Sequence, residues 1–413
     1  MAKIKVVHKS KQKSPQKKLN FRKITPQIVA QALVILAVFG VIIFSLPNLP
    51  QMPTTGANVS YQGVINLWIV DSFEGGSGSR QSWFTKRASK FEQQNKGLFV
   101  CVTVLTEGQL ESKLQQGQNF DMLCFSRGIG EKVIDTLAPL DVDFGCVCEN
   151  FAQSGRLNGT AYALPIFAGA YCLFARQSQQ KQDVLSHCLT TTFTRKIGKN
   201  TIQLAPMVCG FAPYNSPLTA LAMSGGKGSF TPDYAKSQYL AYEQFVENKT
   251  AVTLLGTQRD MYRLQKHLQM GKMEELVFAP LMAYTDLVGY LAVGRHSQNL
   301  QACTRFVEYL LSDQVQQTVA EMGMFSVTNQ NLYSNGWYAL CEQGLKDAYV
   351  PNLFADQDAI SNGRQVALQT LQGNISQQNN SNLPTAMWSH QGQPCYEKQC
   401  KLCWRFFCED WVN

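Results

Sequence analysis

Short apolar runs alternate with amphipathic stretches in the part of the chain that follows residue 62. Residues 64–70 and 98–105 are apolar and rich in β-branched side chains, a composition typical of buried parallel strands. Between them, apolar residues recur at helical spacing. A second helical stretch opens with the capping-box pair Thr106 and Gln109, and another strand is predicted at 121–125. Strands that alternate with helices indicate an α/β fold with a parallel sheet and right-handed crossovers.

The carboxyl ends of these strands are the first place to look for a binding site. In open α/β sheets, ligands bind in the crevice beyond the strand ends. Two polar segments follow predicted strands here, and both lie at that edge of the sheet. Their candidate residues are Asp71, Ser72, Phe73, Ser126 and Arg127.

The alternation continues toward residue 372. Strand-like apolar runs are predicted within 157–176, at 250–255 and at 277–282. Residues 296–323 contain two helical stretches that a Ser-Asp pair interrupts. The chain is long enough for two or three ordinary domains and for a large core.

Motifs spread over residues 63–372 have counterparts in a known family. They include Trp68 in the first strand, the FE-x-x-NKG sequence at 91–97, and a short helix followed by Asp121 before an apolar strand. A second block, residues 296–323, is similar to the paired helices that return the chain to the first lobe in that family. Together these motifs resemble the extracellular solute-binding proteins of ABC importers, and above all their sugar-binding branch.

This resemblance implies a two-lobed clamp of the periplasmic-binding-protein type 2 fold, with a hinge and with each lobe discontinuous in sequence. Lobe one would comprise residues 63–166 and 287–330, and lobe two residues 167–286 and 331–372. Such a protein captures a small polar ligand, foremost a sugar or oligosaccharide, and delivers it to ABC permease subunits. The resemblance implies no cofactor and no catalytic residue, so we expect a binding protein rather than an enzyme. The linker and Cys-rich tail at 373–413 depart from the family pattern.

The resemblance also extends the candidate site into the second lobe. Asp71 and Arg127 are expected to hydrogen-bond the ligand from lobe one, and Phe167 is one of the aromatic residues that could offer a flat surface. Tyr284 and Asp286 lie near the second crossing and are expected to act as hinge or ligand contacts. The residues expected to close the cleft from lobe two are Gly256, Gln258 and Arg259. Family members often have an aromatic or acidic residue where Gln258 stands, so this chain departs from a typical maltose site.

Residues 28–46 form an apolar run long enough to cross a bilayer core of about 30 Å. The basic arm at 1–23 predicts that this end stays in the cytoplasm, which places the remainder outside. We expect an uncleaved, single-pass membrane anchor at 24–46 and a stalk at 47–62. A cleaved signal peptide is the alternative, although its apolar core would be shorter.

The formal net charge of +8 comes from the same basic arm. Nine of the 37 Lys and Arg residues lie within residues 1–23, which leaves 28 basic residues against 29 acidic ones. The folded part is therefore nearly neutral, and we expect no nucleic-acid partner.

All 13 cysteines follow residue 100, and their odd number leaves at least one unpaired in a monomer. Cys101 and Cys124 fall within predicted strands and are expected to act as small core residues. The tail has four cysteines with C-x4-C-x2-C-x4-C spacing, a weak candidate for a zinc site beside disulfides or free thiols. They are Cys395, Cys400, Cys403 and Cys408.

Two other functions are compatible with the sequence. Asp141 and Asp143 form a D-x-D motif, which would suit a type II membrane glycosyltransferase that holds a metal and a nucleotide sugar. Alternatively, the same clamp could be a ligand sensor or a surface interaction module that uses the Cys-rich tail.

The Gly-rich stretch at 74–80 could contact a ligand, but it lacks the Gly-Lys-Ser/Thr sequence of a phosphate loop.

Overall fold

The computed structural model describes residues 63–374, except for residues 72, 74, 142–144 and 179–192. The predicted basic arm, membrane anchor, stalk and tail cysteines lie outside the described residues, as do Ser72 and Asp143. No helix within the described part of the chain is both long and apolar enough to cross a membrane.

The first sheet has five strands in the order β2-β1-β3-β12-β6. Strands β1 (Gly63–Val70), β2 (Leu98–Leu105) and β3 (Met122–Phe125) run parallel, which confirms the predicted alternation of strand and helix. Strand β12 (Val288–Val293) pairs antiparallel with β3, and β6 (Leu164–Ala168) pairs antiparallel with β12. The sheet is therefore completed by segments that lie far along the chain from its parallel part.

Two helices connect the parallel strands. Helix α2 (Arg80–Gln94) begins at Ser79, whose hydroxyl accepts a hydrogen bond from the Ser82 backbone N–H. Helix α3 (Glu107–Gln115) begins with the predicted capping box, in which Thr106 and Gln109 each accept a hydrogen bond from the other's backbone N–H. Local sequence thus sets where these helices start.

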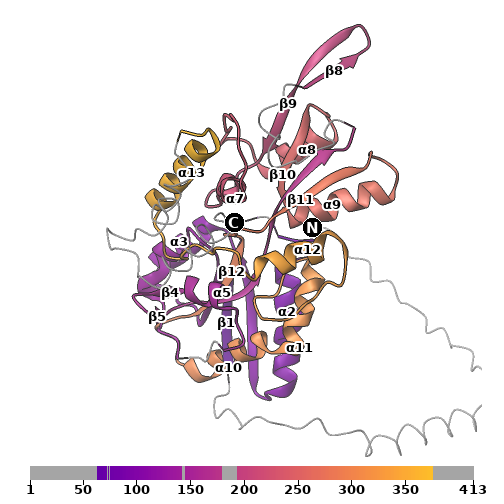
Figure 1. Ribbon diagram of the computed structural model, residues 1–413. Coiled ribbons are helices and arrows are strands. Elements are labelled where there is room, and N and C mark those ends of the chain that lie inside the picture. The colour runs from indigo at the N-terminus through magenta and orange to yellow at the C-terminus, as the bar shows by residue number, and fades with distance from the viewer. Residues whose placement is uncertain (1–62, 72, 74, 142–144, 179–192, 375–413) are drawn as a thin grey trace, which may run out of the picture. The chain divides into compact units, whose positions relative to one another are not determined.

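The second sheet has the order β11-β7-β10-β9-β8. Its strands are β7 (Tyr171–Arg176), β8 (Phe193–Ile197), β9 (Asn200–Cys209), β10 (Ala251–Thr257) and β11 (Leu276–Leu281). Its helices are α7 (Pro217–Met223), α8 (Gln238–Val246) and α9 (Gln258–Gln269). In Figure 1 this sheet, with α8 and α9, is grouped apart from β1, β12, α2 and α10.

The remaining elements cover or connect these two sheets. They are α4 (Gly130–Val133), a 3-10 turn (Ile134–Thr136), α5 (Glu149–Ser154), the hairpin β4 (Arg156–Leu157) and β5 (Thr160–Ala161), α10 (Leu300–Leu311), α11 (Asp313–Gln316), a 3-10 helix (Gln317–Met322), α12 (Gly336–Leu345) and α13 (Gln357–Leu371). Ser312 has an extended backbone between α10 and α11, which is the interruption that the Ser-Asp pair predicted.

The chain passes from the first sheet to the second between β6 and β7, and returns between β11 and β12. Phe325 forms an antiparallel bridge with Ala168, so a third segment runs beside the first passage. Farther along, α12 packs on β11 and α13 packs on α7. Buried apolar side chains from both sheets form one continuous core cluster. The lobe boundaries taken from the sequence remain predictions.

Candidate functional site

A buried carboxylate, that of Asp286, lies in the return passage from the second sheet to the first. Its Oδ1 accepts hydrogen bonds from Tyr171 Oη at 2.7 Å and Asn215 Nδ2 at 3.3 Å. Its Oδ2 accepts from Tyr284 Oη at 2.9 Å and from the Ser216 backbone N–H at 2.8 Å. These donors belong to the start of β7, the loop before α7 and the passage itself, so the carboxylate joins three distant segments.

Arg127 adds a positive charge to this group from the end of β3. Its Nη1 is 3.6 Å from Asp286 Oδ2 and donates a hydrogen bond to Tyr284 Oη at 3.2 Å. The Arg127 side chain is only 2% exposed, yet its Nε and Nη2 have no hydrogen-bond partner within the described residues. Such buried polar atoms normally have a partner, because leaving one unsatisfied costs about 1–3 kcal/mol. The guanidinium could therefore donate further hydrogen bonds from Nε and Nη2.

We call these residues the Asp286 cluster: Arg127, Tyr171, Asn215, Ser216, Tyr284 and Asp286. Two acceptors, Asn215 Oδ1 and the neighbouring Ser126 Oγ, are also buried without a hydrogen-bond partner among the described residues. The cluster thus offers both donors and acceptors at the carboxyl edge of the parallel strands.

The two tyrosines of the cluster act as donors. Burial raises the pKa of the Tyr171 and Tyr284 hydroxyls well above the usual value, and the charge of Asp286 raises both pKa values further. Because a negative charge on either phenol would lie against a carboxylate, both phenols stay protonated at neutral pH.

Arg364 of α13 fixes the loop that carries two members of the cluster. Its Nε donates to the Asn215 carbonyl at 3.1 Å, and its Nη2 donates to the carbonyls of Ala212 at 3.1 Å and Pro213 at 2.9 Å. One guanidinium thereby satisfies three backbone carbonyls of the loop that lies between β9 and α7. The loop is held in the geometry that directs Asn215 and Ser216 at Asp286.

Tyr214 of the same loop connects it to the first sheet. Its ring packs on Gly128, where an added Cβ would lie 2.0 Å from the ring. Its hydroxyl donates to the carboxylate of Glu107 in α3. Burial and the Glu107 contact raise the pKa of Tyr214.

The structure gives Asp71 and Arg127 different partners. The Asp71 carboxylate is half exposed and lies 2.9 Å from Nε of Arg80, whereas Arg127 is paired with Asp286. Arg80 also donates to the Phe73 carbonyl at 2.5 Å and stacks over its ring. Asp71 and Phe73 thus form a small cluster with the first residue of α2, and their proposed role in ligand contact stays a prediction.

The predicted second-lobe residues form contacts to other parts of the fold. Gln258 is fully buried, and its Oε1 accepts from the Ala170 backbone N–H at 3.0 Å. Arg259 donates to the Gly76 carbonyl, which links α9 to the Gly-rich loop before α2. Gly256 faces Asp260, and an added Cβ would lie 2.5 Å from that carboxylate. Gln258 and Arg259 therefore join the second sheet to the passage and to the first sheet, whereas the Gly256 contact lies between β10 and α9.

The Gly-rich loop itself packs tightly against the end of the 3-10 helix. A Cβ added at Gly76 would lie 2.0 Å from the Met322 carbonyl oxygen, and the Gly78 N–H donates to the same oxygen at 3.2 Å. Glycine is needed at Gly76 because there is no room for a side chain.

Phe167 belongs to the core. Its side chain is fully buried, and its ring lies edge-on to Trp83 and Phe84, with centroids 6.5 Å from each. An added Cβ at Gly289 would lie 2.3 Å from the same ring. In this conformation Phe167 stabilises the first sheet and presents no free face.

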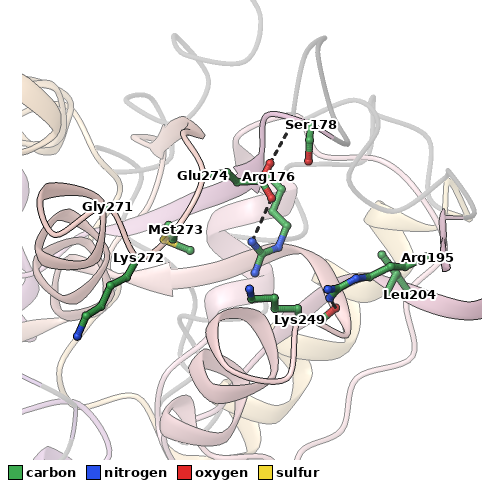
Figure 2. Close-up of a pocket in the computed structure, with 9 residues that line it drawn as sticks. All are labelled: Arg176, Ser178, Arg195, Leu204, Lys249, Gly271, Lys272, Met273 and Glu274. Carbon is green, nitrogen blue, oxygen red and sulfur yellow. Dashed lines mark hydrogen bonds and ion pairs between the residues drawn. The ribbon is translucent and has the colours of Figure 1, made fainter. Parts of the chain in front are cut away.

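A polar cavity of about 550 Å³ lies at the far end of β7 from Tyr171 (Figure 2). Arg176 in its wall is 3.2 Å from the Glu274 carboxylate and donates to the Phe245 carbonyl. Burial alone would raise the pKa of Glu274, but hydrogen bonds from Ser178 and Arg176 outweigh it and lower that pKa. Arg176 is five residue steps along β7 from Tyr171 of the Asp286 cluster, roughly 16 Å at about 3.3 Å per residue.

The fold has clear counterparts among solved structures. No protein-family model and no curated protein sequence matches this chain. The GacH receptor of Streptomyces glaucescens, solved unliganded and with acarbose, matches with a TM-score of 0.53 at 14% identity, over 85% of this chain and 100% of that one. The sugar-binding protein MalE of Xanthomonas citri matches with a TM-score of 0.51 at 14% identity, over 79% and 97%.

This chain has the fold of the sugar-binding solute-binding proteins. A cyclo/maltodextrin-binding protein complexed with maltotetraose matches the same fold with a TM-score of 0.50 at 11% identity, over 80% of this chain and 96% of that one. The predicted α/β clamp fold is confirmed, and the structure builds it from two mixed sheets. In this solute-binding fold, the Asp286 cluster lies where both passages between the sheets meet the carboxyl end of β3.

Sequence reasoning missed several residues of the site. It named Arg127, Tyr284 and Asp286, but gave no role to Asn215, Ser216 or Arg364. A signal was present, since the Asn-Ser-Pro sequence at 215–217 is typical of a helix start, with Pro in the first turn. Nothing in the sequence around Arg364 indicates its contacts, because its partner Asn215 lies 149 positions away.

Proposed function

We propose that this chain is the ligand-capturing component of an ABC importer and that its ligand is a carbohydrate. The observation that carries the proposal is the buried Arg127 guanidinium, with two donors unused beside Asp286 on a sugar-binding fold. Sugar hydroxyls can accept from Arg127 and donate to Asn215 Oδ1 or Ser126 Oγ, so one ligand could satisfy all of these groups.

Capture requires the two lobes to open, because the Asp286 cluster is buried. The two passages between the sheets would form the hinge, because both connect the same two sheets. Contacts that would part on opening are those of Arg259 with Gly76 and of Tyr214 with Glu107. A ligand that binds the closed form more tightly shifts the equilibrium toward it, and no covalent step is involved.

The rest of the proposal concerns location and delivery. The predicted helix at 28–46 would tether the fold outside the membrane, where it would pass the ligand to the permease subunits. Ligand-dependent stimulation of ATP hydrolysis, in vesicles that contain this chain and a permease encoded beside it, tests delivery separately from binding.

Binding is tested by thermal unfolding of the full chain in detergent with maltodextrins, acarbose, monosaccharides, amino acids and polyamines. A ligand at 100 times its dissociation constant adds about 2.7 kcal/mol of stability, which shifts the midpoint visibly. We expect a carbohydrate to produce the shift and Arg127→Lys to abolish it, because Lys keeps the charge but loses the planar set of donors. Arg176→Lys, in the distant cavity, is the matched control and should retain the shift. A shift with amino acids or polyamines alone would overturn the carbohydrate assignment.

A further inference from the structure

Two cysteines that the binding site does not use lie in contact within the second lobe. Cys172 is in β7 and Cys341 is in α12, 169 positions apart in the sequence. Their sulfur atoms are 3.5 Å apart, and both side chains are buried, with exposures of 0% and 2%. Two sulfurs at this distance need to approach by about 1.5 Å to reach the bond length of about 2.04 Å.

The backbones on both sides of the pair are firmly held. Strand β7 is hydrogen-bonded along both edges, to β10 and to β11. Helix α12 is fixed by Trp337, whose ring stacks on Phe278 with centroids 4.8 Å apart, and by Tyr338, whose hydroxyl donates to the Gln258 carbonyl at 3.2 Å. The two sulfurs are therefore held facing each other, and side-chain rotation can supply the remaining approach.

Other buried cysteines in the described part of the chain have different surroundings. The Cys209 sulfur donates to the Gly210 carbonyl at 3.5 Å, and the Cys303 sulfur lies 3.7 Å from Ser297 Oγ. These two sulfurs contact oxygen atoms, whereas the sulfurs of Cys172 and Cys341 face each other. Cys303 therefore offers a matched control for a buried thiol.

We propose that Cys172 and Cys341 form a disulfide that fastens α12 to strand β7 of the second sheet. Two thiols lose two protons and two electrons as the S–S bond forms. The electrons reduce a disulfide oxidant, a thiol oxidase or oxidised glutathione, to two thiols. Oxidation takes place before α12 docks, because burial raises the pKa of the Cys172 thiol and makes it a poor nucleophile once it is enclosed. An extracytoplasmic location would supply the oxidant.

The bond is tested by peptide mapping of the full chain, secreted into an oxidising compartment, denatured in N-ethylmaleimide and digested without reductant. We expect a linked pair of peptides that contains Cys172 and Cys341 and separates on reduction. Recovery of both residues in alkylated form, or of either residue linked to another cysteine, would overturn the proposal. This measurement uses the unaltered protein, so it does not depend on whether a variant folds.

Thermal unfolding with and without a reductant tests whether the disulfide stabilises the fold. Reduction with dithiothreitol should lower the unfolding midpoint of the unaltered protein by about 5–10 °C, because the bond closes a long loop. The variant Cys172→Ala/Cys341→Ala should lose most of this sensitivity, whereas Cys303→Ala should keep it. Equal sensitivity in both variants would contradict a bond between Cys172 and Cys341. Neither measurement involves a ligand, so failure here leaves the sugar-binding proposal unaffected.

Discussion

Nη1 of Arg127 lies 3.6 Å from Oδ2 of Asp286, with the two side chains 2% and 0% exposed. The first residue follows the last parallel strand of the first sheet, and the second lies in the passage that returns from the second sheet. A buried pair of this kind gives little net stability as a whole, but removing one partner leaves the other charge uncompensated. Its location couples the packing of both sheets to the candidate site.

Replacing Asp286 by Ala should therefore be strongly destabilising. The change leaves the Arg127 guanidinium buried and removes the acceptor of Tyr171 and Tyr284. We expect the free energy of unfolding to fall by about 3–5 kcal/mol, measured by urea denaturation. Asp71→Ala is the control, because the Asp71 carboxylate is half exposed and its pair with Arg80 should contribute about 1 kcal/mol or less. Equal losses in the two variants would contradict the importance given to the buried pair.

Alkaline pH should destabilise the protein through the tyrosines of the cluster. The pKa of Tyr171 is raised in the folded state by burial and by Asp286, so the folded protein keeps this proton after the unfolded chain has lost it. The stability that this tyrosine contributes is complete below about pH 10 and declines as pH rises through that value. In Tyr171→Phe, the decline in unfolding free energy from about pH 9 to 11 should be shallower.

The control for that experiment is Tyr239→Phe, since Tyr239 is 60% exposed. The decline in unfolding free energy of Tyr239→Phe should match that of the unaltered protein. If Tyr171→Phe and Tyr239→Phe behave alike in urea denaturation across this pH range, burial of Tyr171 against Asp286 has no energetic consequence.

Arg364→Met should weaken ligand binding although Arg364 is not a member of the Asp286 cluster. The variant keeps an apolar side chain of similar length but leaves the carbonyls of Ala212, Pro213 and Asn215 without their donor. We expect a loss of about 2–4 kcal/mol in unfolding free energy, in line with hydrogen bonds from a charged group. Calorimetry with the sugar found by thermal unfolding should show at least a roughly tenfold weaker affinity, equivalent to about 1.4 kcal/mol. Unchanged affinity would mean that this loop does not position the site.

Gly76→Ala should destabilise the fold, because the new Cβ would lie 2.0 Å from the Met322 carbonyl oxygen. Backbone has to move to relieve this contact, and we expect a loss of about 2–3 kcal/mol by urea denaturation. Gly108→Ala in α3 is the matched control, since nothing lies within 4 Å of the added Cβ. That change should be neutral or stabilising by about 0.5–1 kcal/mol, because Ala favours a helix over Gly. Similar losses in both variants would indicate that the Gly-rich loop is not tightly packed.

The sequence alone determined much of the fold of the first sheet. Strands β1, β2 and β3 appear as short apolar runs, and the Thr106 and Gln109 capping box marks the start of α3. These features depend on neighbours a few positions away, so composition and spacing report them directly. The β8 and β9 hairpin was not predicted, although Gly198, with a φ of 60°, stands at its turn. Its strands alternate little in polarity, because most of β9 is only half-buried or exposed.

Only the tertiary structure decided which residues of the site meet. The sequence named Arg127, Tyr284 and Asp286 separately, but expected Arg127 to act with Asp71, whose partner is Arg80. It could not find Arg364, or the contact of Cys172 with Cys341. Partners in these contacts lie more than a hundred positions apart, with separations of 157 for Arg127 to Tyr284 and 169 for the cysteines. Local periodicity reflects how each segment buries its own apolar face, whereas these contacts depend on how the two sheets and the final helices pack together.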